Sequence, residues 1–288
     1  MNKKDMNILR EISVLEIEKA VEEIFTESNY ILPDDIRISL DKALKIEKSS
    51  ICRTALEDIV ENISVAKELN VPICQDTGMA VIFVEIGQDV HLIDGNLNEA
   101  INRGVSNAYI NGFLRLSVVK DPLRRINTNN NTPAVIHTEI VPGDKVTLTA
   151  APKGFGSENM SQIKMFNPSA TKQDILNFIF SVVVAAGSNP CPPVIVGVGI
   201  GGDFEKSAIL SKKALTRSIE ESNKDQFYAD MEKEALEMIN SSGIGAQGFG
   251  GDITALAVNI ETFPTHIAGL PVAVNIGCHV TRHKTVTL

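Results

Sequence analysis

The change of apolar pattern at Val71-Pro72 constrains the fold of this chain more than any other feature of its sequence. Before this point, apolar residues recur at helical spacing, which predicts helices over residues 6–26 and 50–69 and another that begins at Pro33. Beyond it, short β-branched apolar runs are mixed with helical segments. Helices followed by a mixture of strands and helices are typical of the α+β class. We therefore predict helices around mixed β-sheets, with a helical segment at the N-terminus.

The second part of the chain predicts several strands and helices. Residues 134–140 and 145–150 flank the turn sequence Pro142-Gly143-Asp144, so we predict that they pair as a hairpin. Further strands are predicted over 79–86 and 193–200, and further helices over 98–112, 171–186, 204–221 and 226–240. The chain has no internal repeat, low-complexity tract or evident linker, which favours one large domain over residues 1–288.

Composition and charge exclude several classes of protein. The 288 residues carry a net charge of -9, which disfavours binding to nucleic acid or to anionic membranes. No apolar run reaches the roughly 18–20 residues that cross a bilayer, and the N-terminus lacks an apolar signal core, so we expect a cytoplasmic protein. A dianionic substrate would need local cations to bind to such an acidic chain.

The four cysteines are far apart in the sequence, at Cys52, Cys74, Cys191 and Cys278. An intracellular chain keeps its thiols reduced, and the absence of a C-x-x-C pair argues against zinc ribbons and thioredoxin-like chemistry. Cys52 lies on the apolar face of a predicted helix, which favours a buried small hydrophobic side chain.

The other three cysteines share a different context, because each lies in a Gly- or Pro-flanked turn beside an apolar strand or helix. Three thiolates from such turns suit a [4Fe–4S] cluster with one iron left open, or equally a zinc ion with three thiolate ligands. The residues alone leave a third reading open, in which these turns bind no metal.

The glycine-rich segments have a competing interpretation with a different function, the binding of a dinucleotide or another anion. Residues 197–202 match G-x-G-x-x-G after a predicted strand and before a predicted helix, as in dinucleotide-binding folds. Such a fold needs a second parallel strand soon afterwards, and here another helix is predicted instead. Close strand–helix packing is therefore the favoured reading. The glycine-rich loops 153–159 and 248–252 have room for an anion beside their amides, but ordinary loop turns explain them almost as well.

Two cationic or titratable side chains are ambiguous when they are taken alone. Arg115 stands among apolar residues, where it either extends its head into solvent or, if buried, needs an anion such as a substrate carboxylate. His266 follows Pro264-Thr265, where it is either a structural histidine or part of a site.

Six segments, taken together and in this order, resemble the alpha subunit of class I fumarase and its relative, L-tartrate dehydratase. They span most of the chain from position 50 onward. The segments are PICQDTG at 72–78, LRLSVVKDPLRRINTNNNTPAVIH at 114–137, KGFGSENMS at 153–161, NPCPP at 189–193, VGVGIGGDFEKS at 196–207 and THIAGLPVAVNIGCHVTRHK at 265–284.

The resemblance implies a cofactor and a set of site residues. It implies that a [4Fe–4S] cluster is bound by three of the cysteines, and that five other residues surround the substrate, Asp76 and His266 as catalytic residues. Phe155 departs from the family's usual glycine in the loop that holds Gly156. The implied ligands are Cys74, Cys191 and Cys278, and the implied substrate shell is Gln75, Asp76, Arg115, Gly156 and His266.

The same resemblance implies the reaction. The open iron would act as a Lewis acid, Arg115 would neutralise a carboxylate, and the proton-abstracting base would come from a separate beta subunit. We expect hydration of fumarate to L-malate within a higher-order heteromer, with L-tartrate dehydration as the alternative. The chain ends ten residues after Cys278, so we expect it to lack half of its site.

Three alternative interpretations assign the chain to other classes of protein. An electron-transfer protein would need Cys52 to join the cluster, and a dehydrogenase would need residues 197–202 to bind a pyrophosphate. A non-catalytic module would bind a partner without any metal.

Overall fold

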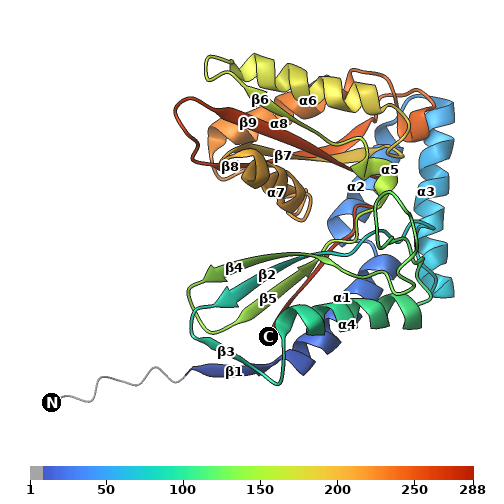
Figure 1. Ribbon diagram of the computed structural model, residues 1–288. Coiled ribbons are helices and arrows are strands. Elements are labelled where there is room, and N and C mark those ends of the chain that lie inside the picture. The colour runs from blue at the N-terminus through green and yellow to red at the C-terminus, as the bar shows by residue number, and fades with distance from the viewer. Residues whose placement is uncertain (1–8) are drawn as a thin grey trace. The chain divides into compact units, whose positions relative to one another are not determined.

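The computed structural model describes residues 9–288, which form two compact units (Figure 1). Unit 1 consists of the residues up to Ile31, Cys74–Lys153 and Arg282–Leu288, and unit 2 consists of Leu32–Ile73 and Gly154–Thr281. Because the chain passes back and forth between the units, no single cut along the sequence separates them. Each unit contains helices and sheets, which confirms the predicted α+β class. That residues 1–288 act as one domain stays a prediction.

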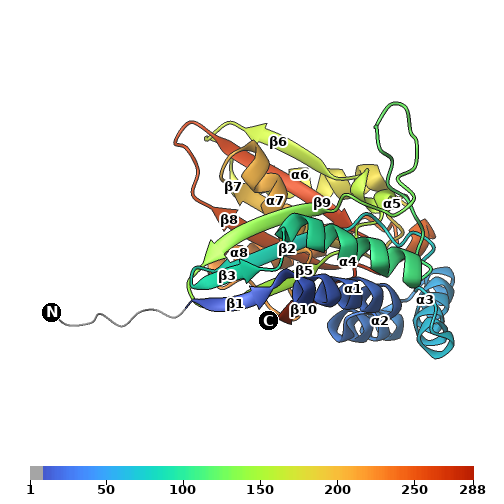
Figure 2. The same cartoon turned by 60° about the horizontal axis from the view of Figure 1, so that its bottom comes forward.

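In the part that the structure describes, unit 1 combines two helices with two sheets. Its elements are β1 (Arg10–Ser13), α1 (Val14–Tyr30), β2 (Val81–Gly87), β3 (Val90–Ile93), α4 (Leu97–Asn111), β4 (Val135–Val141), β5 (Val146–Ala150) and β10 (Lys284–Thr287). Helices α1 and α4 lie side by side in both views (Figures 1 and 2) and share one apolar core with β2 and β5. The larger sheet has the order β10-β5-β2-β4, and β1 pairs with β3 in a separate parallel ribbon.

The predicted hairpin of β4 and β5 is wrong, because β2 lies between these strands. Strand β2 pairs parallel with β4 and antiparallel with β5. The turn at Gly143 arches over the end of β2, where the Gly87 N–H donates to the Lys145 carbonyl at 2.8 Å. A Cβ at Gly87 would lie 2.4 Å from the Gly143 carbonyl oxygen, so this approach requires glycine. The apolar β2 takes an interior place, beside β5, and the more polar β4 takes the edge.

Unit 2 is built on a four-stranded sheet with the order β6-β9-β7-β8. Its elements are α2 (Asp34–Ile46), α3 (Ser50–Leu69), α5 (Phe155–Glu158), β6 (Gln162–Phe166), α6 (Lys172–Ala186), β7 (Val194–Gly201), α7 (Phe204–Ala214), α8 (Gln226–Asn240), the short 3-10 helix η1 (Ala246–Gly248), β8 (Ala255–Phe263) and β9 (Leu270–Gly277). Helices α6 and α8 cover one face of this sheet and α7 covers the other (Figure 1).

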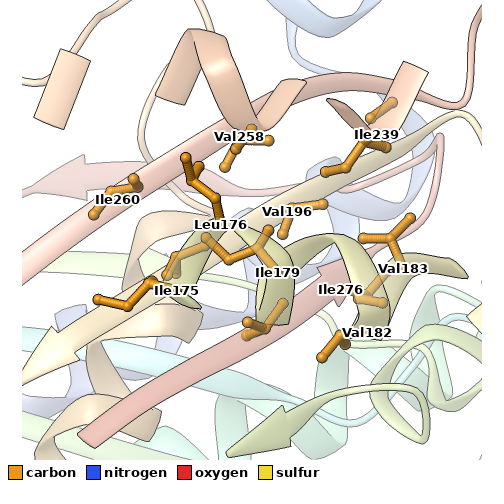
Figure 3. Close-up of a cluster of buried hydrophobic side chains, with 14 of the residues drawn as sticks. Ile175, Leu176, Ile179, Val182, Val183, Val196, Ile239, Val258, Ile260 and Ile276 are labelled. Atoms are coloured by element: carbon orange, nitrogen blue, oxygen red, sulfur yellow. The ribbon is translucent and has the colours of Figure 1, made fainter. Parts of the chain in front are cut away.

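The alternation of residues in β7 explains this layering. Val196 and Val198 face α6 and α8 and belong to one apolar core with them. Figure 3 shows Val196 in this core, together with Ile179, Ile239 and Ile276. Burying each such side chain stabilises the fold by roughly 1.5–3 kcal/mol. The capping box of Thr171 and Asp174 begins α6 at the position that the sequence predicts.

Two helix predictions differ from the structure by more than one residue at an end. The helix predicted over 6–26 begins only at Val14, since residues 10–13 form β1. Ser13 caps the helix by accepting a hydrogen bond from the Leu15 N–H. Residues 6–8 lie outside the described part. The helix predicted over 204–221 ends at Ala214, whose carbonyl accepts from the Asn259 side chain at 3.0 Å. Within residues 9–288, no helix is both long and apolar enough to cross a bilayer.

Candidate active site

The first site loop, Cys74–Gly78, belongs to unit 1 and leads into β2. Gly78 has a φ of 79°, and a Cβ there would lie 2.7 Å from the backbone of Lys153, so the turn requires glycine. The Asp76 carboxylate accepts a hydrogen bond from the Gly78 N–H at 3.0 Å. Gln75 is exposed, whereas Cys74 and Asp76 are half-buried. The turn thus presents an amide, a carboxylate and a thiol within three consecutive residues.

Three buried side chains hold this loop through three consecutive carbonyls. Arg282 donates to the Asp76 carbonyl, and the Tyr109 hydroxyl donates to the carbonyls of Thr77 and Gly78 at 2.9 and 3.0 Å. The Asn131 amide also donates to the Gly78 carbonyl, at 3.1 Å. We call Tyr109, Asn131 and Arg282 the carbonyl cradle. Because its members are 1%, 0% and 4% exposed, they fix the loop from inside unit 1.

Arg115 is attached to the same loop by its backbone. The Arg115 N–H donates to the Thr77 hydroxyl at 2.9 Å, and that hydroxyl donates to the Arg115 carbonyl at 3.3 Å. Asn131 adds a second link, since its side-chain oxygen accepts from the N–H groups of Ser117 and Val118. The Arg115 side chain is exposed. A fixed backbone with an exposed guanidinium suits a residue that binds an anion.

Unit 2 brings Cys191 and Cys278 into neighbouring turns. Cys191 lies between α6 and β7 with a φ of 55°, and Cys278 directly follows β9. The His279 N–H donates to the Cys191 carbonyl at 3.3 Å, and its ring Nδ1 lies 2.9 Å from the same oxygen and 3.3 Å from the Gln247 amide nitrogen. His279 therefore ties the Cys191 turn to the Cys278 turn.

Gly156 lies in the short helix α5, so the loop that the sequence suggested at 153–159 is largely one helical turn. A Cβ at Gly156 would come within 3.4 Å of the Asn189 carbonyl, which places it beside the Cys191 turn. Glu158 in the same turn binds Lys212 of α7 at 2.5 Å and Asn275 of β9 at 3.1 Å. Phe155, at the start of the same turn, is 47% exposed.

His266 lies on the exposed loop between β8 and β9. Its Nδ1 accepts from the Ala268 N–H at 3.1 Å, so a neutral ring carries its proton on Nε2. Thr265 fixes the loop to the far end of β7 by donating to the Gly202 carbonyl at 2.8 Å. The eight residues of β9 separate this loop from Cys278, a span of roughly 25 Å. Within unit 2, His266 is therefore remote from both cysteines.

Cys52 is fully buried in α3, as its position on the apolar face predicted. Its sulfur accepts from the Ala246 N–H at 3.1 Å and lies 3.2 Å from the Glu47 carboxylate. Burial raises the pKa of the Cys52 thiol to about 11. The hydrogen bond to Glu47 and the negative charge of Glu47 also raise this pKa, whereas the hydrogen bond from the Ala246 N–H lowers it. A protonated, enclosed thiol is a poor metal ligand.

Glu47 anchors the glycine-rich loop 248–252, which the sequence left open as an anion site. Its buried carboxylate accepts from the N–H groups of Asp252 and Ile253 at 2.9 and 3.0 Å. Burial by itself would raise the pKa of Glu47, but these hydrogen bonds, with those of Ser49 and Cys52, lower it below its ordinary value. Next to this loop, Gln247 donates to the Pro192 carbonyl at 2.9 Å, which supports the Cys191 turn.

The G-x-G-x-x-G run at 197–202 packs β7 against α7. Cβ atoms at Gly197 and Gly199 would lie 2.1 and 2.0 Å from the carbonyl oxygens of Ser211 and Ser207. This confirms the close strand–helix packing that the sequence favours. The expectation that no second parallel strand follows is wrong, because β8 pairs parallel with β7 after α7 and α8. Asp203 caps α7, and its negative charge disfavours a pyrophosphate there.

The predicted site residues thus form two groups. Unit 1 holds Cys74, Gln75 and Asp76 on one loop with Arg115 bonded beside it, and unit 2 holds Cys191 and Cys278 in joined turns with Gly156 nearby. Among residues 9–288, neither unit by itself gathers three cysteine, histidine or carboxylate side chains in a metal-binding arrangement.

Sequence reasoning missed His279 and the carbonyl cradle. The place of His279 directly after Cys278 was an available signal for a role beside the cysteine turns. The cradle gave no such local signal, although Asn131 and Arg282 lie within the segments 114–137 and 265–284, because its members come from α4, from the loop after it and from the C-terminal segment. Only the fold shows that they converge on one loop.

The chain is similar to known proteins over nearly its whole length. A sequence pattern described as fumarate hydratase (Fumerase) matches residues 18–287. A Methanocaldococcus jannaschii protein, provisionally named L(+)-tartrate dehydratase subunit alpha, is 42% identical over 274 residues, which cover 93% of this chain and 96% of that protein. The L(+)-tartrate dehydratase alpha subunits of Escherichia coli O157:H7 and K12 are each 32% identical over 259 residues, 88% of this chain and 85% of theirs.

Proposed function

We propose that this chain, which belongs to the fumarate hydratase (Fumerase) family of hydro-lyases, is the alpha subunit of a two-subunit enzyme that dehydrates L-tartrate. The membership confirms the resemblance seen in the sequence. The observation that carries the proposal is the similarity over nearly the whole chain to proteins named as tartrate dehydratase alpha subunits. The description of the family favours a second candidate, the hydration of fumarate to L-malate.

The word "alpha" in these names supports a separate beta subunit as the partner. We keep three further expectations as parts of the proposal: that the beta subunit supplies the proton-abstracting base, that the two chains form a higher-order heteromer, and that the enzyme is cytoplasmic.

A [4Fe–4S] cluster is the proposed cofactor, with Cys74, Cys191 and Cys278 as its ligands. The exposure of the thiols supports this choice: none of the three is in a disulfide, Cys191 is exposed and the other two are partly exposed. Their turns are held by main-chain hydrogen bonds, as suits ligands that must not move. When bound, such a cluster supplies a Lewis-acidic iron without a protein ligand. The enclosed Cys52 does not fit the fully capped cluster of an electron-transfer protein.

The remaining residues act on the substrate itself. The exposed Arg115 guanidinium would bind one substrate carboxylate through two parallel hydrogen bonds and fix its orientation. Gln75 would donate its amide to the same molecule, and the Gly156 main chain would approach it without hindrance from a side chain. Asp76, whose carboxylate is held by the Gly78 N–H, would act as a catalytic group in a fixed orientation.

His266 requires a different arrangement. Since it is remote from Cys191 and Cys278 within its own unit, we assign its proposed catalytic role to the site of a second copy of the chain in the heteromer. The protonated Nε2 suits proton donation to a leaving hydroxide. Mixing a His266→Ala chain with a Cys278→Ser chain tests this, because some hybrid assemblies would hold one intact site. Activity should return towards about a quarter of that of wild type, and a mixture without activity would contradict the assignment.

Anaerobic copurification with the beta subunit tests the main proposal. The complex should be brown, contain about four irons for each chain and dehydrate L-tartrate, whereas this chain alone should be inactive. Fumarate hydration is assayed in parallel, and the larger kcat/KM identifies the substrate. A colourless protein that contains zinc would overturn the cofactor, and full activity of this chain alone would overturn the division of the site.

Single substitutions test the site residues. Serine at Cys74, Cys191 or Cys278 should bleach the cluster, and Cys52→Ser is the matched control that should keep it. Arg115→Lys keeps the charge but loses the two-point contact, so kcat/KM should fall by about 30- to 1000-fold with an unchanged cluster spectrum. A nearly normal kcat/KM would make Arg115 an ordinary surface arginine.

A further inference from the structure

Arg282 is a buried cation with few partners. It is 4% exposed, and one of its terminal nitrogens donates to the Asp76 carbonyl. Its Nε and its other terminal nitrogen are buried and have no hydrogen-bond partner among residues 9–288. An arginine is always protonated and offers five N–H donors, so this environment leaves much of its capacity unused.

Arg217 in unit 2 is a partly buried arginine whose Nε likewise has no hydrogen-bond partner among residues 9–288, but its terminal nitrogens bind carboxylates. It binds Glu232 and Glu261, and also donates to the Ile260 carbonyl. A buried charge without such carboxylate partners is costly, and an apolar residue of similar size often stabilises a fold equally well. Arg282 is therefore poorly explained by stability alone.

The position of Arg282 suggests the reason for its charge. Tyr109 and Asn131, the other members of the carbonyl cradle, hold the next two carbonyls of the loop without any charge. Only the carbonyl of Asp76, two residues after Cys74, is held by a cation. Its field also reaches Tyr109: burial raises the pKa of the Tyr109 hydroxyl, and Arg282 acts in the opposite direction.

We propose that Arg282 is a positioning residue that holds the Cys74–Gly78 loop and places a permanent positive charge behind the anionic group bound there. The inference rests on the proposed function, in which that group is an iron–sulfur cluster with thiolate ligands. Local charge and hydrogen bonds set the reduction potential of such clusters. Residues behind the ligands typically change metal affinity by 10- to 100-fold when they are replaced.

Three variants of the complex with the beta subunit test this inference. Arg282→Met removes the charge, Arg282→Lys keeps it, and Tyr109→Phe removes uncharged hydrogen bonds to the same loop. The measurements are the melting temperature of the cluster-free protein, the reduction potential of the cluster and the rate of iron loss on exposure to a chelator.

Arg282→Met should melt at or above the temperature of wild type, shift the potential to a more negative value and lose iron about 10- to 100-fold faster. Arg282→Lys should restore most of the potential, and Tyr109→Phe should leave it nearly unchanged. A clearly lower melting temperature for Arg282→Met would make Arg282 a structural residue, and an unchanged potential would show that its charge has no effect. Either result overturns the inference alone, whereas wild type without a cluster overturns the proposed function as well.

Discussion

Replacing Glu47 by glutamine, which is nearly the same size, should destabilise the protein by about 2 kcal/mol at pH 7. In the structure, the buried carboxylate accepts from four main-chain N–H groups, those of Lys48, Ser49, Asp252 and Ile253. Glutamine keeps only one acceptor oxygen. The Asp252 N–H lies within reach of both carboxylate oxygens, at 3.2 and 2.9 Å, so the favoured orientation of the amide leaves only the Ile253 N–H facing the NH₂ group. A buried donor left without an acceptor costs about 1–3 kcal/mol.

The same bonds give this effect a definite pH dependence. The pKa of Glu47 is lowered in the folded protein from its ordinary value of 4.5. The ionised carboxylate therefore stabilises the fold fully above the unfolded-state pKa, and this contribution is lost as the pH falls through the lower folded-state pKa. The difference between wild type and Glu47→Gln should consequently be constant near neutral pH and should shrink below about pH 4.5.

Urea unfolding measures both quantities. Circular dichroism at 222 nm is the appropriate signal, because the chain has no tryptophan. Glu57→Gln, on the exposed face of α3, is the matched control and should change the stability by less than about 0.5 kcal/mol. A loss of less than about 1 kcal/mol for Glu47→Gln, or a loss that stays constant down to pH 3, would refute the role of the carboxylate as the anchor of the loop 248–252.

Three further predictions concern the exposure of thiols, strand–helix packing and an ion pair. Iodoacetamide at pH 8 should alkylate the exposed Cys191 of the cluster-free protein and spare Cys52, whose thiol is buried with a pKa of about 11. Mass spectrometry of the peptides measures the labelling of each cysteine, and rapid labelling of Cys52 would contradict the prediction. Gly199→Ala should cost about 2–4 kcal/mol in urea unfolding, because its Cβ would lie 2.0 Å from the Ser207 carbonyl, and calorimetry should detect no NAD binding by either protein. Arg217→Met should cost about 3–5 kcal/mol, since it leaves Glu232 buried without its cation, and a stability equal to that of wild type would show that this ion pair is dispensable.

Helices were predictable from the sequence wherever a local signal marks both ends. The segments 50–69 and 226–240 agree with α3 and α8 residue for residue, because Ser49 and Asp225 cap their first turns and apolar periodicity continues to their ends. The order of strands was not predictable in this way. Nothing local in β4 and β5 shows that β2, more than forty residues earlier than β4, enters between them.

The residues of the candidate site also differ in how far the sequence alone predicts them. The turn at Gly78 and the cysteine turns could be found from their residue types, since glycine and proline mark tight turns. The support behind them could not be found, because Tyr109, Asn131 and Arg282 each look ordinary in their own segment. The remoteness of His266 from Cys278 was also hidden, since only the sheet shows that residues 270–277 between them form one extended strand.

The pairing of β10 with β5 has a consequence for the order in which the protein can fold during synthesis. All residues of unit 2 have been made once Thr281 is added, whereas unit 1 still lacks β10, whose partner strand was made more than 130 residues earlier. The part that begins first is thus completed last, and until then the edge of β5 stays open to pairing with other chains. Arg282 arrives with this same final segment, so the loop of Cys74 gains its full support only when synthesis reaches β10.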